Sequence, residues 1–360
     1  TYTFEVPTVA STQLGAETPA VLWSRFAHLE GSILSKSESF VLDPSAMRFE
    51  WKKKDDANWN TLASTQEGEN YKAILTGLQP ETAYMYRLVY SKGSDQYASD
   101  EVMFKTESAT PLPYGDMETW VADGKISYLG AVKDFWDSSN PGGATYIGSN
   151  TFGDTETVHT GGMSAQLASK WAVLKFAAAS LYVGQFVSLV GTKGAKIDFG
   201  RPFTSRPTQL KGWFQYKGGN INRVSGITSI PGTPVAKDDP DLWSAYIVLT
   251  NGTYRLDNTD MTGTSKDFAS ILRTGKDASG FDVIAYGVLP DAECVTSSEW
   301  KQFSIDLTYR NLVEKPTHII IVFSSSKYGD YFVGCDSSVL YLDDLELIYG
   351  DSPKLLGSGN

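Results

Sequence analysis

The sequence predicts an all-β protein built from two consecutive β-sandwiches. Apolar and polar residues alternate along many short runs, and Gly, Pro, Asn and Asp separate these runs. Aromatic residues make up 12% of the chain and charged residues only 20%, as is typical of strand-rich domains. No run of comparable strength shows helical spacing. Strands without crossover helices pair antiparallel, which argues against an α/β fold.

Residues 1–107 form the first predicted domain, a small β-sandwich. Alternating runs predict its strands at Ala20–Arg25, Met47–Lys53, Tyr71–Leu75, Ala83–Tyr90 and Glu101–Thr106. Trp23 and Trp51 fall where such a sandwich keeps core tryptophans. Residues 108–113 are predicted to be a linker, because this stretch is polar and holds two prolines that cannot join a central strand.

Residues 114–350 form the second predicted domain, and residues 351–360 a C-terminal tail. Its strands are predicted at Trp171–Phe176, Ala195–Phe199, Thr208–Lys217, Trp243–Thr250, Phe281–Leu289, Trp300–Leu307 and His318–Ser324, with a closing strand from Val339. The apolar stretch Ala177–Gly194 is interpreted as a buried connection. Ser265–Leu272 is predicted to form one short helix.

Three motifs carry resemblances to known β-sandwich families. LTGLQPETAYMYRLVY at Leu75–Tyr90 resembles the corner of fibronectin type III domains, which implies that the Tyr84 hydroxyl bonds to the backbone upstream. GDMETW at Gly115–Trp120 resembles the opening of jelly-roll carbohydrate-binding modules, and HTGGMSAQLAS at His159–Ser169 resembles a following strand. The expected architecture is therefore an immunoglobulin- or fibronectin III-like sandwich followed by a larger jelly roll.

Two longer stretches of the second domain resemble one family. SSSKYGDYFVGCDSSVLYLDDLELIYG at Ser324–Gly350 is similar to the closing signature of the putative carbohydrate metabolism domain, and GRPFTSRPTQLKGWFQYKG at Gly200–Gly218 to its middle signature. The resemblance implies an exported lipoprotein on the surface of a gut bacterium. It also implies a role concerned with sugars.

The charge balance argues against some partners. A net charge of −11 and a pI of about 4.8 give no basic surface for nucleic acid or an anionic membrane. A glycan or another surface protein needs no such surface. No window reaches the roughly 18 apolar residues of a spanning helix. Since the chain begins at Thr1, we interpret it as a mature or trimmed form, with any lipid anchor upstream.

Two cysteines occur in the chain, Cys294 and Cys335, both in the second domain. Two thiols cannot make a disulfide framework. They are expected either to form a single bridge in an exported protein or to remain small buried apolar residues. The sequence leaves these two alternatives open.

Asp343 interrupts the closing strand. Under strict alternation it shares the more apolar face with Val339, Tyr341 and Leu345. An unpaired carboxylate buried there costs on the order of several kcal/mol. Hydrogen-bond donors or a cation must therefore neutralise it.

The resemblance to jelly-roll modules implies a candidate for that cation. In these modules an acidic residue of the opening motif and an Asp of the last strand often hold a structural Ca²⁺, an ion that prefers oxygen ligands. The corresponding ligands here are Glu118, with Asp116, and Asp343, with its neighbour Asp344. The alternative is that Asp343 accepts backbone N–H bonds and that Glu118 is solvated.

Two tryptophans are candidate platforms for a sugar ring. Trp213 falls among polar residues on one face of the Thr208–Lys217 strand, which predicts an exposed ring. Trp136 falls in a predicted loop beside Asp137 and Asn140, whose side chains can bond sugar hydroxyls. The alternatives are that Trp213 packs under a loop and that Trp136 plugs one.

Arg201 and Arg206 flank Phe203 and complete the predicted ligand-binding set. A guanidinium can bind sugar hydroxyls or the carboxylate of a uronic acid. The alternative for both arginines is a structural role, with hydrogen bonds to backbone carbonyls.

Catalytic signatures are missing from the sequence. Glycoside hydrolysis needs two carboxylates across a cleft, but 42 acidic residues make chance pairs inevitable. No nucleophile elbow, H-E-x-x-H or nucleotide-binding motif occurs. The sequence therefore favours non-catalytic glycan binding by the second domain, with the first domain as a spacer. A structural or adhesive surface protein and a glycoside hydrolase stay as alternatives.

Overall fold

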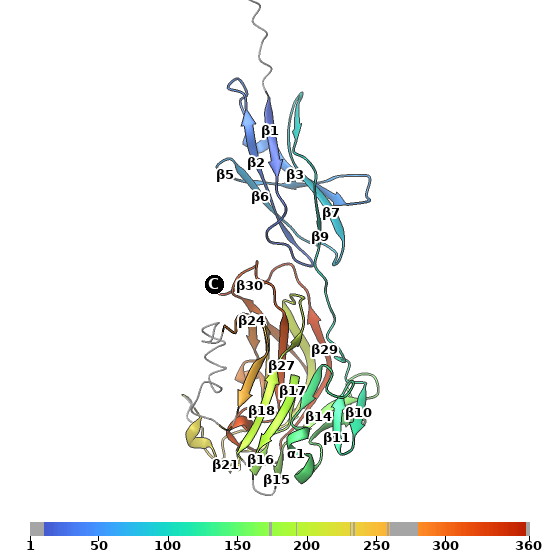
Figure 1. Cartoon of the computed structure of the whole chain (residues 1–360), viewed down its shortest axis with the longest axis vertical. Coiled ribbons are helices and arrows are strands. Elements are labelled where there is room, and N and C mark those ends of the chain that lie inside the picture. The colour runs from blue at the N-terminus through green and yellow to red at the C-terminus, as the bar shows by residue number, and fades with distance from the viewer. Residues whose placement is uncertain are drawn as a thin grey trace, which may run out of the picture. The chain divides into compact units, whose positions relative to one another are not determined.

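The computed structural model describes residues 11–172, 175–191, 193–230, 232, 235–257, 259 and 280–357. The chain forms two compact units, one ending at Ala109 and the other beginning at Thr110. Figure 1 shows that arrows dominate both units, so the predicted all-β class is confirmed. No described helix is long and apolar enough to cross a bilayer.

The first unit is a sandwich of two antiparallel sheets. One sheet has the order β1 (Thr12–Ala16), β2 (Ala27–Lys36), β6 (Asn70–Leu75) and β5 (Thr65–Glu67). The other contains β4 (Asn60–Ala63), β3 (Met47–Lys53), β7 (Ala83–Lys92), β8 (Asp95–Ala98) and β9 (Val102–Lys105). A 3₁₀ turn, η1 (Pro44–Ala46), precedes β3. The core of this unit contains the fully buried side chains of Leu29, Phe49, Tyr86 and Leu88.

The predicted tyrosine corner is present. The Tyr84 hydroxyl accepts a hydrogen bond from Gln79 N at 3.0 Å, which ties the start of β7 to the backbone upstream. The strand predicted at Ala20–Arg25 is wrong, because the extended pairing begins two residues later, at Ala27 in β2. Trp23 nevertheless lies in the interior and stacks on Phe26.

The larger sheet of the second unit has ten strands. Its main path is β23 (Tyr254–Asp257), β18 (Gly194–Phe199), β17 (Ser180–Val190), β27 (His318–Ser324), β22 (Ser244–Thr250), β24 (Val283–Val288), β26 (Thr308–Tyr309) and β30 (Lys354–Leu355). β12 (Trp136–Ser138) pairs with β17, and β19 (Arg201–Pro202) pairs with β27. All these pairings are antiparallel except that of β26 with β30.

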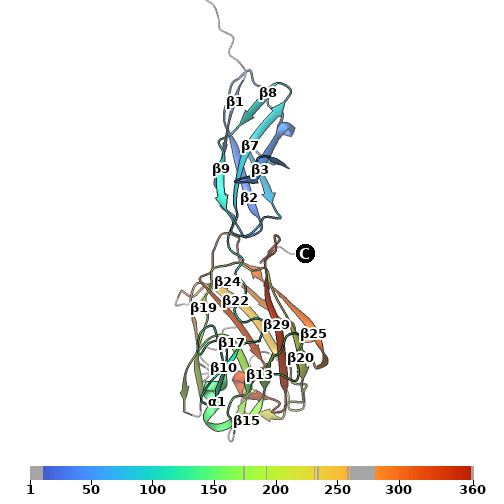
Figure 2. The ribbon, with the colours of Figure 1, turned by 90° about the vertical axis from the view of Figure 1, so that its right-hand side faces the viewer.

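The second sheet of this unit has five strands. Its order is β13 (Thr151–Asp154), β14 (Ser164–Ala168), β29 (Val339–Ile348), β20 (Gln209–Lys217) and β25 (Ser297–Asp306), and Figure 2 shows the last three together. Three two-stranded pairs accompany the sheets in the described part of this unit: β10 (Trp120–Asp123) with β11 (Ile126–Leu129), β15 (Lys170–Ala172) with β16 (Lys175–Ala177), and β21 (Arg223–Val224) with β28 (Val333–Gly334). The described helical elements of the second unit are α1 (Asn140–Ile147), η2 (Ile227–Ser229), η4 (Asp291–Glu293) and η5 (Gly329–Tyr331).

Aromatic side chains join the two sheets into a jelly-roll sandwich. Phe303 of β25 lies 6.0 Å from Phe323 of β27, centroid to centroid. Trp243, which precedes β22, packs at 4.7 Å against Phe214 of β20. Trp243 and Phe323 are both fully buried. Apolar burial of this size supplies the main driving force for closing the sandwich.

Most predicted strands of the second domain recur in the structure, and two predicted segments differ. Ala177–Gly194 is not a connection, because most of it is the long strand β17. Trp171–Phe176 spans the β15–β16 hairpin instead of one strand. The helix predicted at Ser265–Leu272 lies outside the described residues.

The two cysteines do not form the single bridge that was one of the two alternatives. Cys294 and Cys335 are both buried free thiols, and burial raises the pKa of Cys294 to about 12.

Candidate functional site

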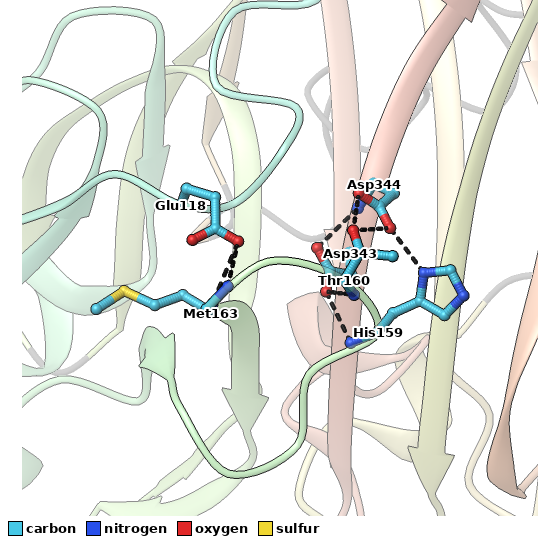
Figure 3. A network of polar contacts seen from close by, with 7 residues as sticks. Glu118, His159, Thr160, Met163, Asp343 and Asp344 are labelled. Carbon is cyan, nitrogen blue, oxygen red and sulfur yellow. Dashed lines mark hydrogen bonds and ion pairs between the residues drawn. The ribbon is translucent and has the colours of Figure 1, made fainter.

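The two predicted metal ligands fasten the same loop, residues 157–163. Glu118 Oε1 accepts hydrogen bonds from Gly162 N at 2.9 Å and Met163 N at 3.2 Å. Asp343 Oδ2 accepts from His159 N at 2.9 Å and Thr160 N at 3.4 Å. Figure 3 shows the two carboxylates reaching this loop from different segments.

A β-bulge explains how Asp343 comes to lie under the loop. The pairing of β20 with β29 shifts register between Lys211 and Trp213, and Asp344 has a positive φ of 48°. Buried leucines therefore occupy even positions before the bulge and odd positions after it: Leu340, Leu342, Leu345 and Leu347. The strict alternation predicted for this strand is wrong at the bulge. Asp343 faces away from the inter-sheet core and is covered by the 157–163 loop.

Backbone N–H groups bond the buried Asp343 carboxylate, as in the alternative to calcium. Asp343 is 0% exposed, and its second oxygen, Oδ1, accepts from Asp344 N at 2.9 Å. Burial raises the pKa of Asp343 to about 6, and the neighbouring Asp344 carboxylate contributes. Among the described residues, no three His, Cys, Asp or Glu side chains converge as metal ligands. Both oxygens of Asp343 and one oxygen of Glu118 accept backbone N–H bonds, which disfavours a calcium site that needs six to eight oxygen ligands.

Trp213 is partly covered by the same loop. The His159 ring stacks on it with a centroid distance of 4.0 Å and an interplanar angle of 19°. His159 Nδ1 lies 2.6 Å from Asp344 Oδ2, and this contact holds the imidazole over the indole. One face of the Trp213 ring is therefore occupied by protein, as in the alternative that places it under a loop.

The structure places the predicted Trp136 cluster inside the fold, which corrects the prediction of an exposed loop. Trp136 is 0% exposed and donates from Nε1 to Pro113 O at 2.8 Å. Asp137 is buried in β12 and accepts from Phe186 N at 2.8 Å. Asn140 is fully buried and bonds four backbone groups, at residues 127, 150 and 151. Loop packing requires these polar groups, so they are not available to a ligand.

The two predicted arginines bond backbone carbonyls. Arg206 is 3% exposed and donates to Leu312 O at 2.6 Å. Arg201 is half-buried and donates to Lys133 O at 2.9 Å. They do not lie in the cavity described next.

A cavity of about 350 Å³ opens on the outer face of the ten-stranded sheet. Residues of β17, β18, β22 and β27 form its floor, and α1, the β15–β16 hairpin and residues 327–332 form its walls. Figure 1 shows α1 and this hairpin next to the ends of β17 and β18. We call it the sheet-face cavity. Its size lies within the roughly 300–1,000 Å³ that is usual for ligand pockets.

Aromatic rings dominate the lining of the sheet-face cavity. The rings are those of Tyr146, Phe176, Tyr182, Phe186, Phe199, Tyr246 and Phe332. Tyr182 and Tyr246 come from the sheet itself, whereas Tyr146 of α1 is 61% exposed and stands at the rim. Flat apolar rings around a concave site suit the C–H faces of a sugar ring.

A few polar groups interrupt this apolar lining. Asn150 is 2% exposed, and its Oδ1 accepts a hydrogen bond from Ser139 Oγ at 2.7 Å. Ser180 N donates to the same Ser139 Oγ at 3.1 Å, so Ser139 links β17 to the residues after α1. In this orientation of the amide, Asn150 Nδ2 has no acceptor among the described residues, but it is sealed from solvent and is not presented to the cavity. The remaining polar side chains of the lining are Lys175, Ser180, Ser244, Ser324, Lys327 and Asp330.

Sequence reasoning missed this cavity, although a signal was available. β27 reads HIIIVFS and is buried at five consecutive positions, so both of its faces are covered. The inner face packs on the second sheet, and the outer face must be covered by something else. A strand such as β27, which is apolar at consecutive positions, therefore indicates that the outer face of its sheet must be covered by other segments or by a ligand.

Comparison with known proteins places the second unit in a family. A model described as the putative carbohydrate metabolism domain matches residues 116–348, which is more than half of the chain. A structure of a putative glycoside hydrolase from Bacteroides vulgatus is 22% identical, with a TM-score of 0.46, over 66% of this chain and 97% of that chain. Another, from Bacteroides thetaiotaomicron, is 17% identical, with a TM-score of 0.48, over 96% and 99%. No curated protein matches the chain.

Proposed function

This chain belongs to the putative carbohydrate metabolism domain family, and we propose that its second unit binds glycans in the sheet-face cavity without cleaving them. The observation that carries the proposal is the cavity itself. It combines aromatic rings from four strands and α1 with a few polar side chains in its lining. The rings can pack on the C–H faces of a sugar, and the polar side chains can bond its hydroxyls.

The carboxylates around the cavity favour binding over hydrolysis. A glycoside hydrolase of the usual kind uses two carboxyl groups, about 5–10 Å apart, on either side of the scissile bond. Among the described residues that line the cavity, Asp330 alone carries a carboxylate. We therefore expect no release of reducing ends from any glycan that the protein binds. Detection of such release would replace the proposal with a hydrolase.

Affinity gel electrophoresis against a panel of neutral and acidic polysaccharides tests the binding site. Phe186→Ala removes a half-buried ring from the cavity and should abolish retardation of the protein. Trp213→Ala is the matched control, because it removes an aromatic ring from the other sheet. Thermal melts of both variants exclude unfolding as the cause.

The control also tests the hypothesis, drawn from the sequence, that the Trp213 ring is the binding platform. Loss of retardation in Trp213→Ala, with Phe186→Ala unaffected, would move the site to the five-stranded sheet. If no polysaccharide of the panel retards the wild-type protein, the proposal of glycan binding is overturned. Adhesion to another surface protein would then become the leading function.

The setting of the protein is a proposal of the same kind. Export to the cell surface and a spacer role for the first unit rest on the family resemblance and on the absence of any catalytic motif in residues 1–107. Protease shaving of intact cells tests the location. Deletion of residues 1–107 should leave glycan binding unchanged, and its loss would show that the first unit takes part.

A further inference from the structure

Lys175 is the feature of the sheet-face cavity that neutral sugars do not explain. It lies in β16 on the cavity wall and is half-buried. Its Nζ donates to Lys193 O at 3.1 Å and stands 3.9 Å over the Phe332 ring. Neither group is an anion, and Lys175 has no carboxylate partner in the part of the chain that the structure describes.

Lys327, the other lysine in the lining, differs from Lys175 because it is paired with a carboxylate. Lys327 Nζ lies 2.6 Å from both carboxylate oxygens of Asp291. Burial lowers the pKa of Lys175, with no opposing contribution from a carboxylate. A partly desolvated ammonium attracts a counter-charge more strongly than a fully hydrated one does. A ligand that carries a negative charge would supply that counter-charge.

The ammonium of Lys175 has unused donor capacity. It carries three N–H donors, and the described residues give it one carbonyl acceptor, Lys193 O. Spare donors on the wall of a cavity favour a ligand that brings acceptor oxygens. A carboxylate has two such oxygens and makes stronger hydrogen bonds with an ammonium than a hydroxyl does.

We propose that the glycan bound in the sheet-face cavity is acidic, with a uronic acid residue whose carboxylate pairs with Lys175. This inference rests on the proposed function, since it names the class of sugar for the same site. The net charge of −11 does not oppose it, because charges farther than about 8 Å are largely screened at physiological ionic strength. The aromatic rings hold the sugar ring, and Lys175 selects its charge.

Isothermal titration calorimetry with paired ligands tests the proposal. The probes are oligosaccharides of polygalacturonate, alginate and glucuronoxylan, each compared with its carboxyl-reduced, neutral counterpart. We expect the wild type to bind at least one acidic probe roughly tenfold or more tighter than its reduced form, as for one charge-assisted hydrogen bond. Lys175→Met keeps most of the side-chain stem and should remove this preference, whereas Lys175→Arg should retain part of it.

Lys170→Met is the matched control. Lys170 lies in β15 of the same hairpin and donates to Ser149 O at 3.1 Å, but it does not line the cavity. This variant should keep the preference for the acidic probe. Equal binding of acidic and reduced probes, or a preference that survives Lys175→Met, overturns the inference and leaves glycan binding intact. Failure of every acidic and every reduced probe to bind overturns both proposals.

Discussion

The two sheets of the second unit differ in their outer faces. In β20 of the five-stranded sheet, buried and partly exposed residues alternate, and the outer face carries polar side chains around Trp213. In β27 of the ten-stranded sheet, five consecutive residues are buried. One outer face is polar and is partly covered by the 157–163 loop, whereas the other is largely apolar and leaves a cavity. The proposed glycan site therefore rests on a sheet face that remains apolar, and not on an isolated tryptophan among polar residues.

The largest expected effect is a difference in unfolding free energy between substitutions on the two faces of β27. Ile321 of β27 is 0% exposed and points into the inter-sheet core, and Ile321→Ala should cost about 2–5 kcal/mol of unfolding free energy. Val322 is its neighbour on the cavity face, and Val322→Ala should cost only about 1–2 kcal/mol, because it widens an existing cavity. Urea denaturation of the full chain measures both. Equal costs would contradict the view that the outer face is not closely packed.

A pair of glycine substitutions compares the packing of the two sheets. A Cβ on Gly212 of β20 would overlap Leu345 Cδ2 and approach the Phe303 ring to 2.9 Å, so Gly212→Ala should cost about 1–3 kcal/mol. A Cβ on Gly142 of α1 would lie 3.3 Å from the Phe186 ring, at the cavity. Gly142→Ala should stay within about 1 kcal/mol of the wild type, because alanine favours the helix. Thermal melts distinguish the two, and a destabilised Gly142→Ala protein would mean that the cavity wall is as tightly packed as the core.

The smallest expected effect is a pH dependence in the five-stranded sheet. Burial raises the pKa of Asp343 to about 6, above the value of 3.8 that applies to the unfolded chain. Between pH 4 and 6 the native state then binds more protons than the unfolded state, so this group lowers stability as the pH rises through that range. Asp343→Asn removes the titration and turns an N–H₂ group toward backbone donors.

The measurement is the difference in unfolding free energy between the wild type and Asp343→Asn. The advantage of the wild type should shrink as the pH rises from 4 to 6 and should then stay level. Asp241, whose pKa burial also raises to about 6, titrates in both proteins and cancels in the difference. A difference that does not change with pH would show that the amides of the 157–163 loop hold Asp343 ionised throughout.

Much of the fold was predictable because the signals that define strands are local. The alternation at Met47–Lys53 coincides with β3, and the predicted strand at His318–Ser324 coincides with β27. The bond between Tyr84 and Gln79 follows from a short motif in which both partners are five residues apart. The strand at Ala20–Arg25 was misplaced because Trp23 and Phe26 pack as a core plug without ladder pairing.

The candidate site was less predictable because its parts come from distant segments. Trp136 and Asn140 read as loop residues, yet the pairing of β12 with β17 buries the first and the turns around α1 bury the second. Glu118 and Asp343 were grouped in sequence as metal ligands, whereas in the structure both accept backbone N–H bonds from residues 159–163, and Asp343 also accepts one from Asp344. No local pattern shows which partner a buried carboxylate will find.

By itself, the sequence determined the all-β class, the positions of most strands and the membership of the second unit in its family, because period-two alternation and short motifs are properties of neighbouring residues. Only the tertiary structure decided which aromatic rings and charges remain available to a ligand. The bulge at Asp344 reverses the faces of β29, and α1 with the β15–β16 hairpin encloses one face of β17 and β18. Accessibility depends on these long-range pairings, and they bring together residues that are far apart along the chain.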